Sequence, residues 1–116
     1  MSPKSDLKAF SRHCDTYLRR FGVGHYGVRY ELAVADATVR AMSEVDSVSG
    51  SARVSLNPNR NDKGIDPSLR RLAKHEALHV MLGEFSELAW GRCVSKEALR
   101  MAEEELVRKL LRLIPD

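Results

Sequence analysis

Apolar residues recur every three or four positions near the start of the chain. The repeat runs from Ser5 to Phe21 with charged residues between its members, which are Leu7, Phe10, Cys14, Tyr17, Leu18 and Phe21. This spacing predicts an amphipathic helix whose apolar face packs on a core. We expect Ser5 or Asp6 to cap its start, because both side chains can accept from free backbone N–H groups, and Gly22 to end it.

The pattern then changes from helical spacing to alternation. Apolar and polar residues alternate in the stretches 26–34, 37–45 and 52–56, and this period of two predicts strands with one buried face. A polar segment, Asn57 to Gly64, is expected to be an exposed loop. Because the connections are short, the expected arrangement is a small three-stranded antiparallel sheet whose strands pair in chain order.

Helical spacing returns in the second half of the chain. Asp66 and Pro67 form a helix start, an acidic cap followed by a proline where no backbone donor is needed, and the helix is expected to run to about Leu82. Its apolar residues cover most of the circumference, which predicts a central and mostly buried helix. The stretch Glu84 to Gly91 is expected to be a short connection or an irregular helix.

Composition narrows the class of protein. The chain has 116 residues, 43% of them hydrophobic, so residues 1–116 are expected to form a single α+β domain. The net charge is only +3 and the basic residues are spread out, which does not indicate nucleic-acid binding.

Cys14 and Cys93 form no C-x-x-C pair, which favours free thiols in a reducing compartment. Because no apolar run resembles a signal peptide or a membrane span, we expect a cytoplasmic protein without a membrane partner.

The central helix carries the candidate chemistry. Its residues 75–79 read His-Glu-Ala-Leu-His, so that His75 and His79 lie one helical turn apart and can reach one metal ion, with Glu76 beside them. Isolated charge on a side that otherwise belongs to the core would be unfavourable, which makes a bound metal the simplest explanation. Catalytic zinc has three protein ligands and leaves one position open, so a third ligand is expected elsewhere in the chain.

The last predicted helix offers that third ligand. We expect Ser95 to cap this helix and Ile114 to lie near its end. It contains three consecutive glutamates. On a helical wheel with Leu99 at zero, the angles are within ~20° for Leu106 and Leu110, ~40° for Glu103, ~140° for Glu104 and ~240° for Glu105. Glu103 shares the apolar face and is the preferred ligand, with Glu104 second, because face assignments near helix ends can shift by a residue.

These residues carry a family resemblance. The His-Glu-x-x-His motif, followed about two dozen residues later by a glutamate-bearing helix, resembles the gluzincin branch of the zincin metallopeptidases. The order of elements is similar to small phage-encoded and ImmA/IrrE-type metallopeptidases. The resemblance implies a minimal zincin fold that hydrolyses peptide bonds of a peptide or protein substrate with a zinc-activated water. His75, His79 and Glu103 would then bind Zn²⁺, and Glu76 would be the general base.

The resemblance also suggests where a substrate binds. In zincins the substrate commonly lies as an extra strand along a sheet edge, and the stretch Ser51 to Leu56 is the expected edge. His25 or Tyr26 could stabilise the oxyanion, although ordinary packing is the more usual role of a loop aromatic.

Two further functions remain open. The first is a zincin-fold module that holds zinc but acts in binding or structure with little or no catalysis. Retention of Glu76 argues against it, because a purely structural site has no use for a carboxylate that does not bind the metal. The second is a helical nucleic-acid-binding protein that uses Arg70, Arg71, Lys74 and the C-terminal arginines.

Overall fold

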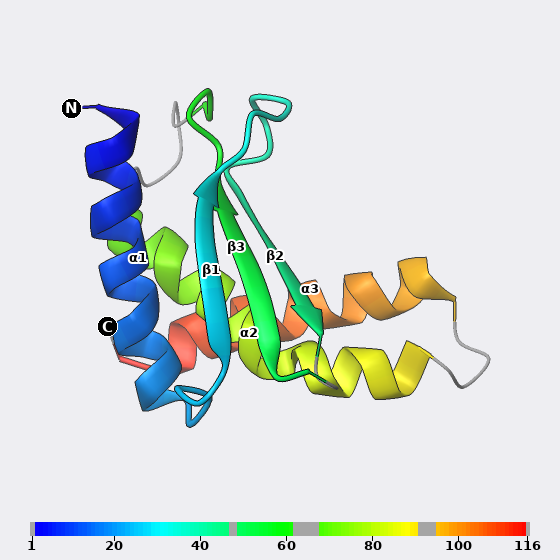
Figure 1. Ribbon diagram of the computed structural model, residues 1–116. Helices are drawn as coiled ribbons and strands as arrows, with labels where there is room; N and C mark the ends of the chain where they lie inside the picture. Colours follow the sequence, from blue (N-terminus) through cyan, green and yellow to red (C-terminus); the bar gives the residue numbers. More distant parts are fainter. Residues whose placement is uncertain (1, 47–48, 62–67, 91–94, 116) are drawn as a thin grey trace.

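The computed structural model describes residues 2–46, 49–61, 68–90 and 95–115. Within these ranges the chain forms three helices and three strands, in the order α1 (Pro3–Arg20), β1 (Gly27–Leu32), β2 (Ala41–Asp46), β3 (Ser51–Leu56), α2 (Leu69–Trp90) and α3 (Lys96–Leu113). The expected α+β class and order of elements are therefore confirmed. Helix α1 lies beside β1, and α3 runs alongside α2 (Figure 1). Within the described ranges, no helix has the length and apolar character needed to cross a membrane.

The sheet is mixed, so the expected antiparallel sheet in chain order is wrong. The strand order is β1-β3-β2, in which β3 pairs parallel with β1 and antiparallel with β2. The connection between β1 and β2, residues 33–40, is long enough to pass the end of β3 and leave space for that strand between its neighbours. Alternation along a strand reports which face is buried but not which strand is the neighbour, so the sequence pattern could not reveal this order.

Asn57 holds the connection that makes this topology possible. Its amide nitrogen donates to the carbonyl oxygens of Ala35 (3.1 Å), Asp36 (3.0 Å) and Val39 (2.8 Å). Its side-chain oxygen accepts from the backbone N–H of Asn59 at 2.9 Å. Asn57 is only 2% exposed, whereas the sequence predicted a residue of an exposed loop. A polar side chain is needed here because the connection between β1 and β2 has no neighbouring strand with which its backbone groups could form hydrogen bonds.

The main core lies between α1, the sheet and α2. Residues on the covered face of β3 are buried and alternate with more exposed ones. The fully packed cluster comprises Phe10, Cys14, Tyr17 and Leu18 of α1, Ala52, Val54 and Leu56 of β3, and Leu72, Ala73, Ala77 and Val80 of α2. The Cys14 thiol donates to the Ala73 carbonyl oxygen at 3.6 Å, and burial raises its pKa. Cys14 is therefore a buried free thiol, while Cys93 lies outside the described residues.

Helix α1 begins earlier than expected. The Ser2 side chain, not that of Ser5 or Asp6, caps the helix by accepting from the backbone N–H of Ser5 at 3.2 Å. Pro3 occupies the first turn, where its missing N–H costs nothing, and this explains the earlier start. At the other end Gly22 has a φ of 78°, which confirms its expected role as the left-handed residue after the helix.

Helix α2 continues past the expected end at Leu82. It runs to Trp90, so of the two expectations for the stretch after residue 83, a short connection or an irregular helix, the structure has helix. Gly83 does not end the helix. A Cβ at this position would lie 2.7 Å from side-chain atoms of Val45, so the glycine permits close approach of α2 to β2. The expected Asp66-Pro67 helix start lies outside the described residues.

Lys74 joins the end of α3 to α2. Its side chain is 1% exposed, and its ammonium group donates to the carbonyl oxygens of Leu111, at 3.2 Å, and Ile114. A cation at the C-terminal end of a helix satisfies carbonyl groups that have no helical partner and interacts favourably with the helix dipole. Lys74 is thus unavailable for phosphate contacts, which removes one of the residues on which the nucleic-acid hypothesis depended.

Candidate metal centre

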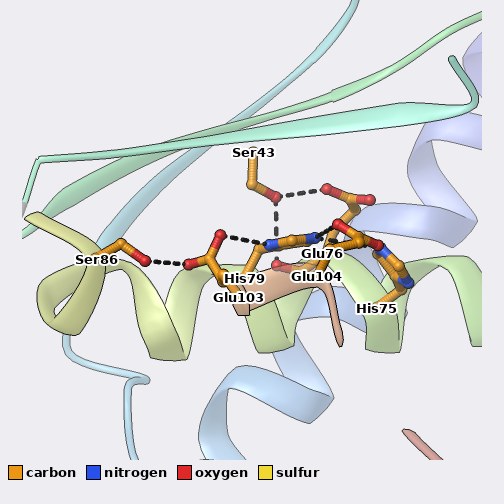
Figure 2. A network of polar contacts seen from close by, with 7 residues as sticks. All are labelled: Ser43, His75, Glu76, His79, Ser86, Glu103 and Glu104. Atoms are coloured by element: carbon orange, nitrogen blue, oxygen red, sulfur yellow. Dashed lines mark hydrogen bonds and ion pairs between the residues drawn. The ribbon is translucent and has the colours of Figure 1, made fainter. Parts of the chain in front are cut away.

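The two histidines of the motif lie where α2 faces α3. Side-chain exposure is 25% for His75 and 17% for His79, while Glu76 is 4% exposed and faces β2. Helix α2 contacts α1, β2 and α3, so residues one or two positions apart on it meet different partners. Figure 2 shows the imidazoles and the carboxylates of Glu76, Glu103 and Glu104 gathered in one place.

Potential metal-ligand atoms of three residues lie close together. The Glu104 carboxylate places Oε1 3.1 Å from His75 Nε2 and Oε2 3.0 Å from His79 Nε2. The two Nε2 atoms are 3.2 Å apart. Within the described part of the chain, His75, His79 and Glu104 form the one group of three such residues that could hold a metal ion.

The ligand types and spacing suit a divalent transition metal. Two imidazole nitrogens and one carboxylate oxygen form a usual donor set for catalytic zinc, whose bonds of ~2.0–2.2 Å in tetrahedral geometry separate neighbouring ligand atoms by about 3.3 Å. The two nitrogens are 3.2 Å apart, close to that value, and each lies 3.0–3.1 Å from a different oxygen of Glu104, so that one ligand atom from each residue falls within 4.8 Å of the others. The residues present therefore fit a divalent cation of this kind, although imidazole and carboxylate also suit other transition metals.

The third member of the group is Glu104, whereas the wheel ranked Glu103 first. The wheel assumed that Leu106 marks the buried face of α3, but Leu106 is 39% exposed and Val107 is fully buried. The buried face is therefore turned by about one residue, or ~100°, from the one assumed. Glu103 and Glu104 are both partly buried, and they lie on either side of the part of the α3 surface that faces α2.

Glu103 contacts the other nitrogen of the same imidazole. Its Oε2 lies 3.1 Å from His79 Nδ1, and its Oε1 accepts from the Ser86 hydroxyl. A carboxylate accepts hydrogen bonds, so this contact favours the tautomer with the proton on Nδ1 and leaves the lone pair of Nε2 free for a metal. Ser86 reaches Glu103 because α2 continues past Gly83. With the helix expected to end at Leu82, this contact could not be predicted from the sequence.

Ser43 of β2 fixes the carboxylate of Glu76. Its hydroxyl donates to Glu76 Oε1 at 2.7 Å and lies 3.3 Å from the Glu76 carbonyl oxygen (Figure 2). Sequence reasoning missed this residue as part of the site. The available signal was a serine among the apolar positions of an alternating strand, which indicates a polar group on the covered face.

Burial and neighbouring charges shift the pKa values of the two imidazoles in opposite directions. Burial lowers the pKa of His75, and the adjacent His79 lowers it further. Burial acts the same way on His79, but the hydrogen bond with Glu103 and the charge of Glu76 outweigh it and raise the pKa. Burial raises the pKa of Glu76, partly offset by the Ser43 hydrogen bond. Three carboxylates share this space, so a bound cation would offset their mutual repulsion.

A cavity of about 530 Å³ opens beside this group. It is lined by His75, Glu76, His79 and Glu104 on one side and by residues 38–43 on the other. The sheet edge that borders it is β2, so the expected edge at Ser51 to Leu56 is wrong. That stretch is the central strand β3, whose backbone pairs on both sides. Strand β2 pairs with β3 on one side only, within the described residues.

Neither His25 nor Tyr26 lines this cavity. Their rings contact each other edge to face, with centroids 5.1 Å apart, and Tyr26 lines a different cavity together with Asp15 and Tyr30. The structure therefore gives neither residue a position from which it would stabilise an oxyanion at the histidines.

Comparison of the chain with known protein families, with curated proteins and with solved structures found no match.

Proposed function

We propose that this protein is a zinc-dependent peptidase with a minimal zincin fold, in which His75, His79 and Glu104 hold the metal and Glu76 is the general base. The observation that carries the proposal is the convergence of His75 Nε2, His79 Nε2 and the Glu104 carboxylate within 3.2 Å, beside a buried carboxylate outside the ligand group. Glu103, the ligand favoured by the sequence, becomes the residue that positions His79.

Each polar residue of the site has a distinct part in this mechanism. When bound, zinc supplies a Lewis acid that lowers the pKa of a water molecule and polarises the scissile carbonyl. Glu76 takes the proton of the attacking water and returns a proton to the leaving amine. Burial raises the pKa of Glu76 toward the range in which a general base works well. The Ser43 hydroxyl orients this carboxylate, and Glu103 keeps the Nδ1 proton on His79.

The substrate is a peptide that lies in the cavity against β2. An extended chain can add to an exposed strand edge through main-chain hydrogen bonds, and β2 runs past Glu76 at Ser43. Such a peptide would bring one of its carbonyl groups next to the three candidate ligands. Because main-chain hydrogen bonds do not depend on side chains, this mode of binding would accept peptides of several sequences. Contacts to peptide side chains at the two ends of β2 would then add sequence preference.

A zinc-holding module without catalysis is the second candidate. A purely structural zinc site is closed by four protein ligands, whereas the group found among the described residues has three. Glu76 also lines the cavity, although it does not belong to that group. Both features favour catalysis over a structural role.

The test combines metal analysis with peptide cleavage. Purified protein should contain or take up one equivalent of zinc, and a proteome-derived peptide library should be cleaved by wild type but not by Glu76→Gln. The variant should keep its zinc, because Glu76 is outside the ligand group. Loss of a general base typically lowers the rate by about 10²–10⁴-fold. Glu105→Gln is the matched control, because it makes the same chemical change at a side chain that is 68% exposed and does not line the cavity, and it should cleave as wild type does.

Three results would change the conclusion. Zinc binding without cleavage under any condition would favour the non-catalytic module. Failure to bind zinc even after supplementation would remove both candidates. Equal cleavage by wild type and Glu76→Gln would retain the peptidase but reject Glu76 as its base.

A further inference from the structure

The cavity at the metal centre is the middle part of a longer groove. It shares Arg40, Leu72 and His75 with a cavity of about 390 Å³ at one end. It shares Ser43, Arg100 and Glu103 with a cavity of about 360 Å³ at the other end. The shared lining places the three cavities next to one another, and residues 40–45 contribute to each in turn, so we describe the three together as one groove. An extended peptide that reaches the histidines would therefore extend into one or both ends.

The two ends differ in charge. The first is lined by four arginines, Arg40, Arg71, Arg108 and Arg112, together with Leu72, His75 and Leu111. No carboxylate is among the described residues that line it. The opposite end has mixed charge, with three glutamates, 44, 87 and 103, beside Lys96 and Arg100. We refer to the first as the arginine end. Its charges come from three separate parts of the chain: the residue that precedes β2, helix α2 and helix α3.

The arginine end lies a short distance along β2 from the candidate general base. The backbone N–H of Asn57 donates to the Arg40 carbonyl oxygen at 3.0 Å, so the pairing of β2 with β3 extends to Arg40. Arg40 is three residues before Ser43, which contacts Glu76. At about 3.3 Å per residue this separation is about 10 Å. A peptide alongside β2 would thus place a side chain two or three positions from its reacting bond within this end.

We propose that the arginine end is a subsite for a carboxylate, which selects peptides with an aspartate or glutamate two or three residues to one side of the cleaved bond. The guanidinium group matches a carboxylate in shape and charge through paired N–H donors, so several arginines around one hollow form a good carboxylate receptor. The cleavage part of this inference rests on the proposed peptidase function, whereas the binding part can be tested without it.

Binding is measured first, with Glu76→Gln protein supplied with zinc so that the peptide survives. The probes are fluorescent eight-residue peptides with blocked ends, one carrying two adjacent glutamates and its matched partner carrying two glutamines. We expect the glutamate peptide to bind about 10–100-fold more tightly, the range for hydrogen bonds to charged groups. A third peptide with glutamines and a free C-terminal carboxylate separates side-chain recognition from capture of a chain end. Equal dissociation constants for the two blocked peptides would overturn the proposal.

Charge reversal locates the effect. Arg71→Glu with Arg112→Glu leaves two positive and two negative charges at the arginine end and should abolish the preference for glutamate. The matched control is Lys8→Glu with Arg12→Glu, which makes the same change in net charge at two exposed positions of α1 that do not line the groove. Thermal unfolding of both variants checks that the fold is retained. A preference lost equally in both would show a general charge effect and reject the subsite.

Cleavage of a proteome-derived peptide library then distinguishes the two proposals. Enrichment of acidic residues on one side of the cleaved bond, lost in the Arg71→Glu/Arg112→Glu variant, supports the subsite in a working peptidase. Cleavage with no acidic enrichment overturns the subsite and leaves the peptidase. A glutamate preference in binding without any cleavage keeps the subsite and overturns the peptidase.

Discussion

The two sides of α2 are built on different principles. Toward α1 and the sheet, α2 contributes to a cluster of eleven buried residues that contains no charged group. Toward α3, polar contacts join the two helices: Lys74 contacts the end of α3, His75 contacts Glu104, and His79 contacts both Glu103 and Glu104. Val107 is the one fully buried residue among those described in α3. The comparison indicates that one side of α2 supplies stability and the other supplies chemistry.

This difference has a physical reason. Burying apolar side chains stabilises a fold without regard to their orientation, whereas imidazoles and carboxylates stabilise it only when each has a partner. At the metal centre the charges of Glu103 and Glu104 oppose that of the buried Glu76, so a bound cation would reduce this repulsion and stabilise the folded state. Substitutions on the two sides should therefore affect different measurements.

The largest effect is expected in the apolar side. Phe10→Ala removes a ring that is fully buried in the cluster and should lower the free energy of unfolding by about 3–5 kcal/mol. Urea unfolding measures this loss, and zinc affinity of the folded protein should stay unchanged. Phe85→Ala is the control, because Phe85 is 58% exposed and its removal should change stability by no more than about 0.5 kcal/mol. Equal losses in the two variants would contradict the division between sides.

The next effect concerns the three consecutive glutamates of α3. Glu104→Ala removes a proposed ligand and should weaken zinc binding by more than about 100-fold, whereas Glu103→Ala removes the partner of His79 and should weaken it by about 10–100-fold. Glu105→Ala, at a side chain that is 68% exposed, should leave zinc affinity unchanged. Competition with a chelator of known affinity measures all three. If Glu103→Ala has the larger effect, the ligand is the one favoured by the helical wheel.

A smaller effect is expected where Lys74 meets the end of α3. Lys74→Met keeps the apolar stem but removes the donors to Leu111 and Ile114, and should destabilise the protein by about 2 kcal/mol. Hydrogen exchange should show faster opening at the end of α3 than in α1. Lys109→Met changes the same charge at a side chain that is 61% exposed and should have little effect. Unchanged exchange in Lys74→Met would show that packing alone holds α3.

The smallest effect concerns how the stability of the apolar side depends on pH above neutrality. The Tyr30 hydroxyl donates to Asp15 Oδ1 at 2.6 Å, and burial together with this hydrogen bond raises its pKa. Stability that depends on the protonated hydroxyl is present below the unfolded-state pKa of about 10 and is lost as pH rises above it. Tyr30→Phe should therefore cost about 1 kcal/mol at pH 7, and the difference from wild type should narrow above pH 10. A difference that widens with pH in urea unfolding would reverse the sign of this argument.

The elements were largely predictable because they depend on neighbours in sequence. The helical stripe in α1, the alternation in β3 and the Ser95 cap of α3 are local patterns, and the structure confirms each of them. Errors arose where a residue has a distant partner. The helix of the motif was expected to end near Leu82, but α2 continues through Gly83, whose small size accommodates Val45 of β2. Asn57 was interpreted as a loop residue, but it satisfies the backbone of the β1–β2 connection.

For the candidate site, the motif on α2 was visible in the sequence because its spacing lies within one helical turn. That spacing alone brings His75 and His79 together on any helix. The sequence by itself thus determined the order of elements and the pair of histidines. Tertiary structure decided which glutamate faces them, that Ser43 holds Glu76, and that β2 rather than β3 borders the cavity. These depend on the rotation of α3 about its axis and on strand order, which are set by packing between elements far apart in the chain.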